Sequence, residues 1–441
     1  MDRSNFEADT IVVGAGAAGL ATAIFAARRM PGRRIVALDG AEKLGAKILI
    51  SGGGRCNVTN RLVLPADFWG GSANVVRRVL ASFPPERTVE FFREIGVGLH
   101  EEEDGKLFPD TNSAKDVLAA LLGEGARRGV ELRCGRRVHA IERQGRGFWV
   151  AASGGNLTAR SVVLATGGQS YPRTGSDGGG YTLAQRFGHT IVPTTPALAP
   201  LVLDGTFHTP LAGVSHEVEL TVYVDGARPA RIRGPMLWTH FGVSGPAAMN
   251  ASRHWHRACV EGSSVRIVAN LLPGDDLASA ERALLARADA QPRAALRTVL
   301  HDRLPVRVAD AVLARLRVPG QVPLAHLSRE QRRTLLRGVL AFSLPVRGSR
   351  GYAHAEATAG GVALGEIDPR TMESRRCPGL FLAGEILDVD GRIGGFNFQW
   401  AWSSGYVAAG GVARVVSTPE LCVPDGEYRT EHTGSDGTSR K

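Results

Sequence analysis

The stretch that decides the fold is Thr10-Ile11-Val12-Val13-Gly14-Ala15-Gly16-Ala17-Ala18-Gly19, close to the start of the chain. Its first four residues form the apolar run of a buried strand, and the Ala-rich segment 20–29 has helical character. The glycines between them follow the spacing G-x-G-x-x-G. Gly14 allows the tight turn, Gly16 lets the backbone approach a pyrophosphate, and Gly19 lets helix and strand pack closely. The pattern predicts a dinucleotide-binding strand–turn–helix unit.

A carboxylate follows at the spacing that such a site requires. Asp39 lies about 20 residues beyond the last glycine, at the end of a second apolar run, and can bind ribose hydroxyls. Three features favour FAD over NAD. The unit lies at the extreme N-terminus, and the strand-like run 162–164 continues into Ala165-Thr166-Gly167-Gly168, a form by which flavoproteins pass the chain past the cofactor. A third segment near the C-terminus, Ala383-Gly384-Glu385, is expected to return to the same site. The sequence contains no second G-x-G-x-x-G to hold a separate nicotinamide nucleotide.

Two further clusters combine glycines with polar groups. In Ser51-Gly52-Gly53-Gly54-Arg55-Cys56-Asn57 the glycines leave the backbone free to lie against a flat ring or a phosphate, beside a guanidinium, a thiol and an amide. Gly394-Gly395 stands where a helix begins, so its N–H groups and the helix dipole can stabilise negative charge on a reduced flavin. The four aromatic residues between positions 396 and 402 are more typical of a helix core.

The pattern of predicted secondary structure changes twice along the 441 residues. Alternating strands and helices are expected up to the proline-rich stretch Pro193 to Pro210, and a strand-rich and then helical region follows it. The alternating pattern returns after residue 353. We therefore predict an α/β fold. Its units are a FAD-binding domain in two parts (1–192 and 353–417), a β-rich insert (193–352) with a helical subdomain at about 275–340, and a disordered tail (418–441).

Charge and cysteine usage limit the class of protein. The formal net charge is +10, and residues 191–350 alone sum to +8, which suits a nucleic acid or another polyanion but equally suits solvated arginine. The five cysteines are scattered and never spaced C-x-x-C, so neither a disulfide framework nor a zinc knuckle is expected. No apolar run reaches the roughly 18 residues of a membrane span. We expect a cytoplasmic protein without a metal, a membrane or an obligate protein partner.

The sequence also resembles a known family. The motifs that carry the resemblance are the glycine turn, S-G-G-G-R-C-N-V-T-N at 51–60, A-T-G-G-Q-S-Y-P at 165–172, T-G-S-D-G at 174–178, T-H-F-G-V-S-G-P-A at 239–247, G-E-I-L-D-V-D-G at 384–391 and G-G-F-N-F-Q-W-A at 394–401. They resemble bacterial NAD(P)/FAD-dependent oxidoreductases, also described as the aminoacetone oxidase family of FAD-binding enzymes. The match spans roughly residues 9–412 and implies a two-dinucleotide-fold (Rossmann-like) FAD domain with an inserted β-barrel and a small helical domain.

The resemblance also implies where FAD is bound. Together with the motifs above it predicts cofactor contacts at Gly14, Ala15, Gly16, Gly19, Asp39, Lys47, Ser51, Gly52, Gly54, Arg55, Cys56, Asn57, Val138, Thr166, Gly167, Gly384, Glu385, Asp388, Gly394, Gly395, Asn397 and Phe398. Three positions depart from the family pattern: Asp39 replaces a common Glu, Ala46 replaces the Arg usual before Lys47, and Phe396 stands where Tyr is common. The resemblance implies that Ala46, in place of the usual Arg, makes a weaker phosphate contact.

Members of this family are associated with aminoacetone oxidation, with reduction of activated C=C bonds in bile-acid intermediates, and with reduction of uridine to dihydrouridine in ribosomal RNA. We expect a reductase that passes hydride from NAD(P)H through FAD to an activated C=C bond, with uridine in ribosomal RNA as one acceptor. The alternatives are a small-molecule enone reductase and an aminoketone or amine oxidase that releases hydrogen peroxide.

Such a reduction needs a proton donor and a group that polarises the neighbouring carbonyl. The predicted donors are Cys56, Tyr171, His240 and Glu385, and the polarising group is Arg55 or Arg392. Cys56 comes first because it lies in the glycine loop expected at the flavin, although a structural thiol fits there too; His240 is equally consistent with a buried, hydrogen-bonded histidine. If the substrate is RNA, the predicted cationic face consists of Arg231, Arg233, Arg253, Arg257, Arg332, Arg333, Arg337, Arg347 and Arg350.

Overall fold

The computed structural model describes residues 6–417. Its largest sheet has nine strands, and the order of its main path is β20 (Ile367–Asp368), β21 (Glu373–Ser374), β22 (Leu380–Leu382), β10 (Gly155–Leu164), β1 (Ala8–Val13), β2 (Ile35–Leu38) and β7 (Glu131–Arg133). β8 (Val138–Gln144) and β9 (Gly147–Ala152) extend it as antiparallel strands through β10. Because β10 pairs in parallel with both β1 and β22, this sheet unites the beginning and the end of the sequence.

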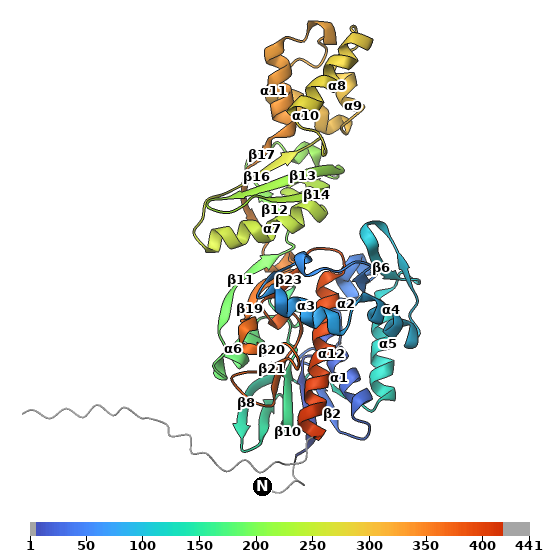
Figure 1. The fold of residues 1–441 in the computed structure, drawn as a ribbon, viewed down its shortest axis with the longest axis vertical. Helices are drawn as coiled ribbons and strands as arrows, with labels where there is room; N and C mark the ends of the chain where they lie inside the picture. The colour runs from blue at the N-terminus through green and yellow to red at the C-terminus, as the bar shows by residue number, and fades with distance from the viewer. Residues whose placement is uncertain (1–5, 418–441) are drawn as a thin grey trace, which may run out of the picture.

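Two long helices from opposite ends of the sequence lie side by side against this sheet (Figure 1). α1 (Ala17–Arg29) follows the glycine turn, and α12 (Phe396–Ser417) follows Gly394-Gly395. They pack closely because Gly405 has no side chain: a Cβ there would lie 2.9 Å from the Ala18 carbonyl oxygen. The other helices of this part are α2 (Ala46–Ile50), α3 (Ala73–Ser82), α4 (Pro85–Glu94), α5 (Ala114–Arg127) and α6 (Gly179–Arg186).

Smaller sheets surround the main one. β3 (Thr59–Asn60), β6 (Lys106–Pro109) and β5 (Leu99–Glu101) form one, and β4 (Phe68–Gly70) pairs with β23 (Val389–Gly391). β11 (Ile191–Ala197) pairs with β19 (Ala357–Val362), so the predicted domain boundary after residue 192 falls inside a strand. The prolines that suggested a linker are tolerated because β11 is an edge strand whose register shifts between Val192 and Thr195.

The inserted region is built on a separate antiparallel sheet of seven strands. Their order is β17 (Phe342–Leu344), β16 (Val265–Asn270), β13 (Ser215–Val224), β14 (Ala230–Thr239), β15 (Gly242–Ser244), β12 (Leu201–Leu203) and β18 (Val346–Ser349), with α7 (Gly245–Val260) packed against it. Within residues 6–417 no ladder joins the end strands β17 and β18. Closure into the implied β-barrel therefore stays a prediction.

A bundle of helices stands on this sheet, at the end of the molecule away from α1 and α12 (Figure 1). Its helices are α8 (Leu277–Ala290), α9 (Leu296–His301), α10 (Val306–Leu316) and α11 (Arg329–Leu340). Prolines separate them; Pro305, for example, directly precedes the first residue of α10. The bundle and the sheet share one hydrophobic core, whereas the FAD-domain strands and helices form another.

Within residues 6–417, no helix is both long enough and apolar enough to cross a membrane. The same part of the chain contains no group of three or more His, Cys, Asp or Glu side chains arranged to hold a metal ion. The predicted tail, residues 418–441, lies outside the described residues.

Candidate functional site

A cavity of about 390 Å³ lies where the glycine-rich segments converge. This volume is in the range of small-molecule sites, which is about 300–1,000 Å³. Its walls come from the turn before α1, from α2 and the loop after it, from the segment 165–180, and from the first turns of α12. Four further residues, Leu198, Pro246, Glu356 and Ile393, close the end at which the insert meets the main sheet.

The three glycines of the first turn have different surroundings. A Cβ on Gly14, whose φ is +98°, would lie 2.5 Å from the Ala165 carbonyl oxygen, and a Cβ on Gly19 would lie 1.8 Å from that of Gly14. At Gly16 a Cβ would meet no protein atom within 4 Å, because the residue faces the cavity. Gly14 and Gly19 thus serve the fold, whereas Gly16 keeps space free for a ligand.

Asp39 stands at the end of β2 and is fixed by two backbone donors. Its Oδ2 accepts a hydrogen bond from the Ala15 N–H at 2.7 Å, and its Oδ1 accepts one from the Ala41 N–H at 2.8 Å. The carboxylate lines the cavity and keeps lone pairs for ribose hydroxyls. Ala15 itself is buried and contributes to the site by holding Asp39.

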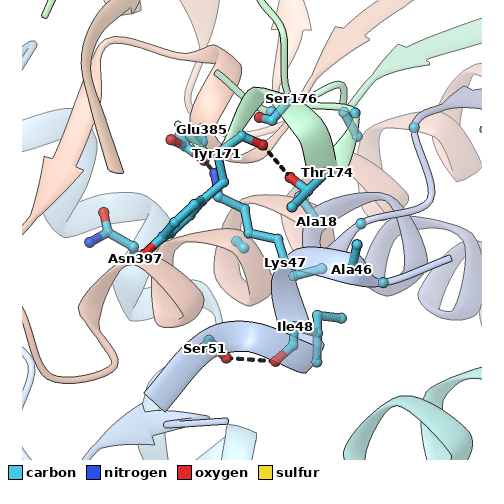
Figure 2. A pocket seen from close by; sticks show the side chains of 18 of the residues that line it. Ala18, Ala46, Lys47, Ile48, Ser51, Tyr171, Thr174, Ser176, Glu385 and Asn397 are labelled. Carbon is cyan, nitrogen blue, oxygen red and sulfur yellow. Dashed lines mark hydrogen bonds and ion pairs between the residues drawn. The ribbon is translucent and has the colours of Figure 1, made fainter. Parts of the chain in front are cut away.

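Lys47 and Glu385 form the centre of a polar network on one wall. Lys47 extends from α2 to Glu385, with which it forms an ion pair (Figure 2), and it also donates to the Ser170 hydroxyl at 2.5 Å. Glu385 Oε1 accepts hydrogen bonds from the Ser170 hydroxyl at 2.7 Å and from the Thr358 N–H at 2.8 Å. Both oxygens of Glu385 are thus occupied as acceptors.

Two buried hydroxyls on the cavity wall are unsatisfied. Thr166 Oγ1 and Ser176 Oγ have no hydrogen-bond partner among the described residues, although both residues line the cavity. Buried polar groups normally find partners, so this wall is suited to a ligand that carries polar atoms.

The family described as "HI0933-like protein Rossmann domain" matches residues 8–411. The chain belongs to this family of FAD-dependent oxidoreductases. It is 36% identical over 412 residues to the ribosomal RNA dihydrouridine synthase of Escherichia coli, covering 91% of this chain and 97% of that protein. It is 34% identical over 397 residues to the 3-dehydro-bile acid delta(4,6)-reductase of Clostridium scindens, covering 90% and 97%. The Haemophilus influenzae ribosomal RNA dihydrouridine synthase is 32% identical over 412 residues, covering 92% and 98%.

The cavity of this HI0933-like protein fits FAD in three respects: the space at Gly16, the carboxylate of Asp39 and the unsatisfied hydroxyls of Thr166 and Ser176. When bound, FAD supplies a ring that accepts and donates hydride. The predicted FAD contacts that line the cavity are Gly14, Gly16, Asp39, Lys47, Ser51, Gly52, Asn57, Val138, Thr166, Gly167, Glu385, Gly394, Gly395, Asn397 and Phe398.

The remaining predicted FAD contacts are not among the residues that line the cavity: Ala15, Gly19, Gly54, Arg55, Cys56, Gly384 and Asp388. Gly384 is tight against α1, where a Cβ would lie 2.6 Å from that of Ala18. Asp388 is buried, and burial together with the charge of Asp390 raises its pKa. These two residues shape the chain around the site.

The loop 51–57 divides between the cavity and the core. Cys56 has a left-handed φ of 63° and is fully buried in the hydrophobic core of the FAD domain. Burial raises the pKa of its thiol to about 12, although a hydrogen bond with Ser51 opposes this shift. Arg55 turns away to Glu102, at 2.6 Å, and lies over the Phe108 ring. The glycine spacing correctly indicates a loop at the cavity, but it does not reveal which side chains face inward.

Two other predicted catalytic residues also lie outside the cavity lining. Arg392 pairs with Asp67 at 2.7 Å and covers the Phe396 ring, and His240 packs edge-on against Phe241. Tyr171 does line the cavity, with its ring pointing toward Asn397 (Figure 2). Burial raises the pKa of the Tyr171 phenol, and the nearby charge of Glu356 raises it further.

Glu356 is the acidic lining residue that the motifs do not indicate. It follows the short 3-10 turn Tyr352–His354 and precedes β19, outside every glycine cluster. No spacing rule connects it to the glycine turn at residue 14, because only the folding of the chain brings the two segments to one cavity. A lone Glu in a loop gives no functional signal in a single sequence.

Proposed function

We propose that this protein is a reductase that passes hydride from NAD(P)H through FAD to an activated C=C bond, and that its acceptor is a uridine in ribosomal RNA. The observation that carries the choice of RNA is a row of arginines on α11. Arg329, Arg333 and Arg337 are exposed and recur every four residues, so they lie along one face of the helix. We call these three residues the α11 arginine row.

The positive charge of the insert is concentrated in the bundle. Residues 277–340 contain twelve arginines and five carboxylates, for a formal charge of +7. Four of these arginines are paired with carboxylates: Arg287, Arg297, Arg303 and Arg332. Within the described residues, the guanidinium groups of the α11 arginine row are exposed and have no hydrogen-bond or ion-pair partner. Like charges four residues apart destabilise a helix slightly, and an anionic partner would offset that cost.

This row replaces most of the cationic face expected from the sequence. Arg253 is buried against Asp390, Arg257 donates to the Pro193 carbonyl, and Arg332 pairs with Glu281. Arg347 lies 3.6 Å from Asp204, and Arg350 lies over the Phe241 ring. Arg231 and Arg233 on β14 are exposed, as are Arg333 and Arg337.

The chain path and the shape of the molecule suit a long substrate. α11 leads directly into β17 and β18, and the chain then reaches Glu356 in the cavity wall. The α11 arginine row thus lies on the same stretch of chain as Glu356, a residue of the cavity wall. The bundle extends far from the main sheet (Figure 1). A polyanion could contact the bundle through its phosphates while one unstacked base enters the cavity.

A small enone is the second candidate, because the bile-acid reductase of C. scindens matches over a similar length of chain. Because that match covers 90% of this chain, the presence of the bundle does not distinguish the two candidates. The positive charge of the bundle is what favours RNA. The oxidase alternative has no specific support: five basic and four acidic side chains line the cavity, so their charges nearly cancel and do not select a cationic amine.

The experiment that tests this proposal follows the flavin spectrum without oxygen. The FAD-loaded protein is reduced with NADPH or NADH and then mixed with unmodified ribosomal RNA transcript, a 4-en-3-one steroid or aminoacetone. We expect reoxidation by the transcript, with dihydrouridine in the digested RNA. Reoxidation by the steroid alone would favour the small enone, and peroxide release with aminoacetone in air would favour the oxidase.

A further inference from the structure

Glu356 lies at the end of the cavity where the insert meets the FAD domain. Its backbone N–H donates to the Leu198 carbonyl at 3.1 Å, which fixes the position of its chain segment. Leu198 itself has a left-handed φ of 55° and lines the same end, together with Pro246 at the start of α7. Residues of both domains therefore line the cavity beside Glu356, and a substrate held by the insert would enter from this side.

Glu356 differs from the other acidic residues that line the cavity. Asp39 accepts two backbone hydrogen bonds, and Glu385 is held by Lys47, Ser170 and Thr358. Asp177 pairs with an arginine at 2.8 Å and also accepts from a backbone N–H at 3.0 Å. Within residues 6–417, the carboxyl group of Glu356 has no such partner. Among the described residues of the lining, it is the one acid whose carboxyl oxygens have no protein partner, so both are available to a substrate.

The surroundings of Glu356 favour its protonated form. Glu356 is exposed to the open space of the cavity. Desolvation by the protein around that cavity raises the pKa of its carboxyl group, while the charge of Lys47 acts in the opposite direction. Tyr171 lies close enough for the charge of Glu356 to raise the pKa of its phenol. A carboxyl group with a raised pKa keeps its proton to a higher pH than an ordinary glutamic acid and can donate it in a reaction.

We propose that Glu356 is the proton donor of the reduction, an inference that rests on the proposed function. NAD(P)H supplies a hydride, which carries the two electrons of the reduction and reaches the carbon of the C=C bond that is β to the carbonyl; in uridine this is C6. The π electrons form a new C–H bond at the α carbon, C5, with the proton of the Glu356 carboxyl group. The carboxylate that remains takes a proton from solvent before the next turnover.

The other cavity groups are less suited to this step. Glu385 is occupied as an acceptor on both oxygens. The pKa of Tyr171 is raised above that of an ordinary phenol, which makes the phenol a weaker acid. Cys56 lies in the core rather than on the cavity wall. Tyr171 remains suited to orienting the substrate beside Glu356.

The test compares FAD-loaded wild type with Glu356→Gln, which keeps the shape of the side chain but has no acidic proton. We expect unchanged FAD content and unchanged flavin reduction by NADPH. Reoxidation by the better of two probes, unmodified ribosomal RNA transcript or a 4-en-3-one steroid, should slow by about 10²–10⁴-fold. Glu356→Asp should recover part of the rate. Glu217→Gln, on the exposed part of β13, provides the same chemical change outside the cavity and should reoxidise like wild type.

The pH profile gives a second readout. In wild type the reoxidation rate should fall as the pH rises through the pKa of Glu356, because only the protonated form donates. Glu356→Gln should lack this fall. A variant that reoxidises as fast as wild type, with the same pH profile, would overturn the proposal. A wild type that reduces neither probe would instead overturn the proposed function.

A third readout does not depend on turnover. The phenol titration of Tyr171, isolated as the ultraviolet difference from Tyr171→Phe, should move to lower pH in Glu356→Gln, because the neighbouring charge is gone. An unchanged titration would mean that the two side chains do not face each other, which would overturn the placement of Glu356.

Discussion

The FAD domain and the helical bundle use arginine in opposite ways. In the FAD domain, Glu124 is almost fully buried and draws Arg28, Arg127 and Arg128 around it at distances of 2.7–2.9 Å. In the bundle, the α11 arginine row remains exposed, and no acid among residues 6–417 pairs with it. The first arrangement stabilises the fold around the cofactor cavity, and the second leaves charge available to a partner. Under the proposed function, cofactor binding and RNA recognition belong to different cores of the molecule.

The largest difference between the two regions is expected from Gly16→Val, which should abolish FAD retention and leave RNA binding unchanged. Gly16 has an extended backbone that any residue can adopt, and its Cβ would meet no protein atom, so the fold should tolerate the change. A bound pyrophosphate would collide with the side chain, so FAD retention should be lost. We expect a colourless protein that melts cooperatively and still binds RNA. Gly19→Val, whose Cβ would clash with backbone, should instead unfold the domain.

Reversing the charge of the α11 arginine row should have the converse effect. Replacing Arg329, Arg333 and Arg337 with Glu should reduce the slope of log affinity for ribosomal RNA against log salt by about 3, with FAD content unchanged. Filter binding at several salt concentrations measures this slope. As a matched control, Arg287, Arg297 and Arg303, which are paired with carboxylates, are replaced with Glu. This variant should lower the stability of the bundle but change the salt slope less than the first variant does. Equal slopes for the two triple variants would remove the distinction between the regions.

Acid should weaken the FAD domain through Glu124. Burial acts to raise its pKa, but hydrogen bonds from Arg128, Arg28 and Arg127 outweigh burial and hold the pKa at about 2 instead of 4.5. This stabilisation is complete above pH 4.5 and is lost as the pH falls toward 2. It amounts to about 3 kcal/mol at neutral pH. Glu124→Gln should unfold more easily in urea at pH 7, and the difference from wild type should shrink in acid.

A smaller effect is expected from Asp39→Ala. FAD affinity should fall by about 1–3 kcal/mol, the cost of losing a charge-assisted hydrogen bond to ribose. Part of this loss would come from the Ala15 N–H, which would lose its acceptor. Isothermal titration of the FAD-free protein measures it, and RNA binding should not change. Unchanged FAD affinity would place the ribose contact elsewhere.

The smallest effect concerns the stability contributed by Glu356. Because folding raises the pKa of this residue above 4.5, its protonated form favours the native state, and that contribution is lost as the pH rises through the raised pKa. Glu356→Gln should therefore match wild type below pH 4.5 and melt at a higher temperature above the raised pKa. A melting temperature that is lower than wild type at every pH would show that the carboxylate is paired in solution.

The sequence alone determined the features that depend on local geometry. The spacing of Gly14, Gly16 and Gly19 after an apolar run dictates a turn that only glycine can make, and Asp39 follows at a distance set by one helix and one strand. These features need no knowledge of which segments meet in space.

Tertiary structure alone decided which side chains face the cavity and which arginines remain unpaired. Cys56 is next to Asn57 in the sequence, yet a left-handed backbone turns the thiol into the core while the amide residue lines the cavity. Arg332 and Arg333 are adjacent as well, but only the first reaches an acid, on α8. Glu356 gains its surroundings from segments more than a hundred residues away, such as those of Lys47 and Tyr171. Burial and charge pairing depend on distances between segments, and a one-dimensional pattern does not contain those distances.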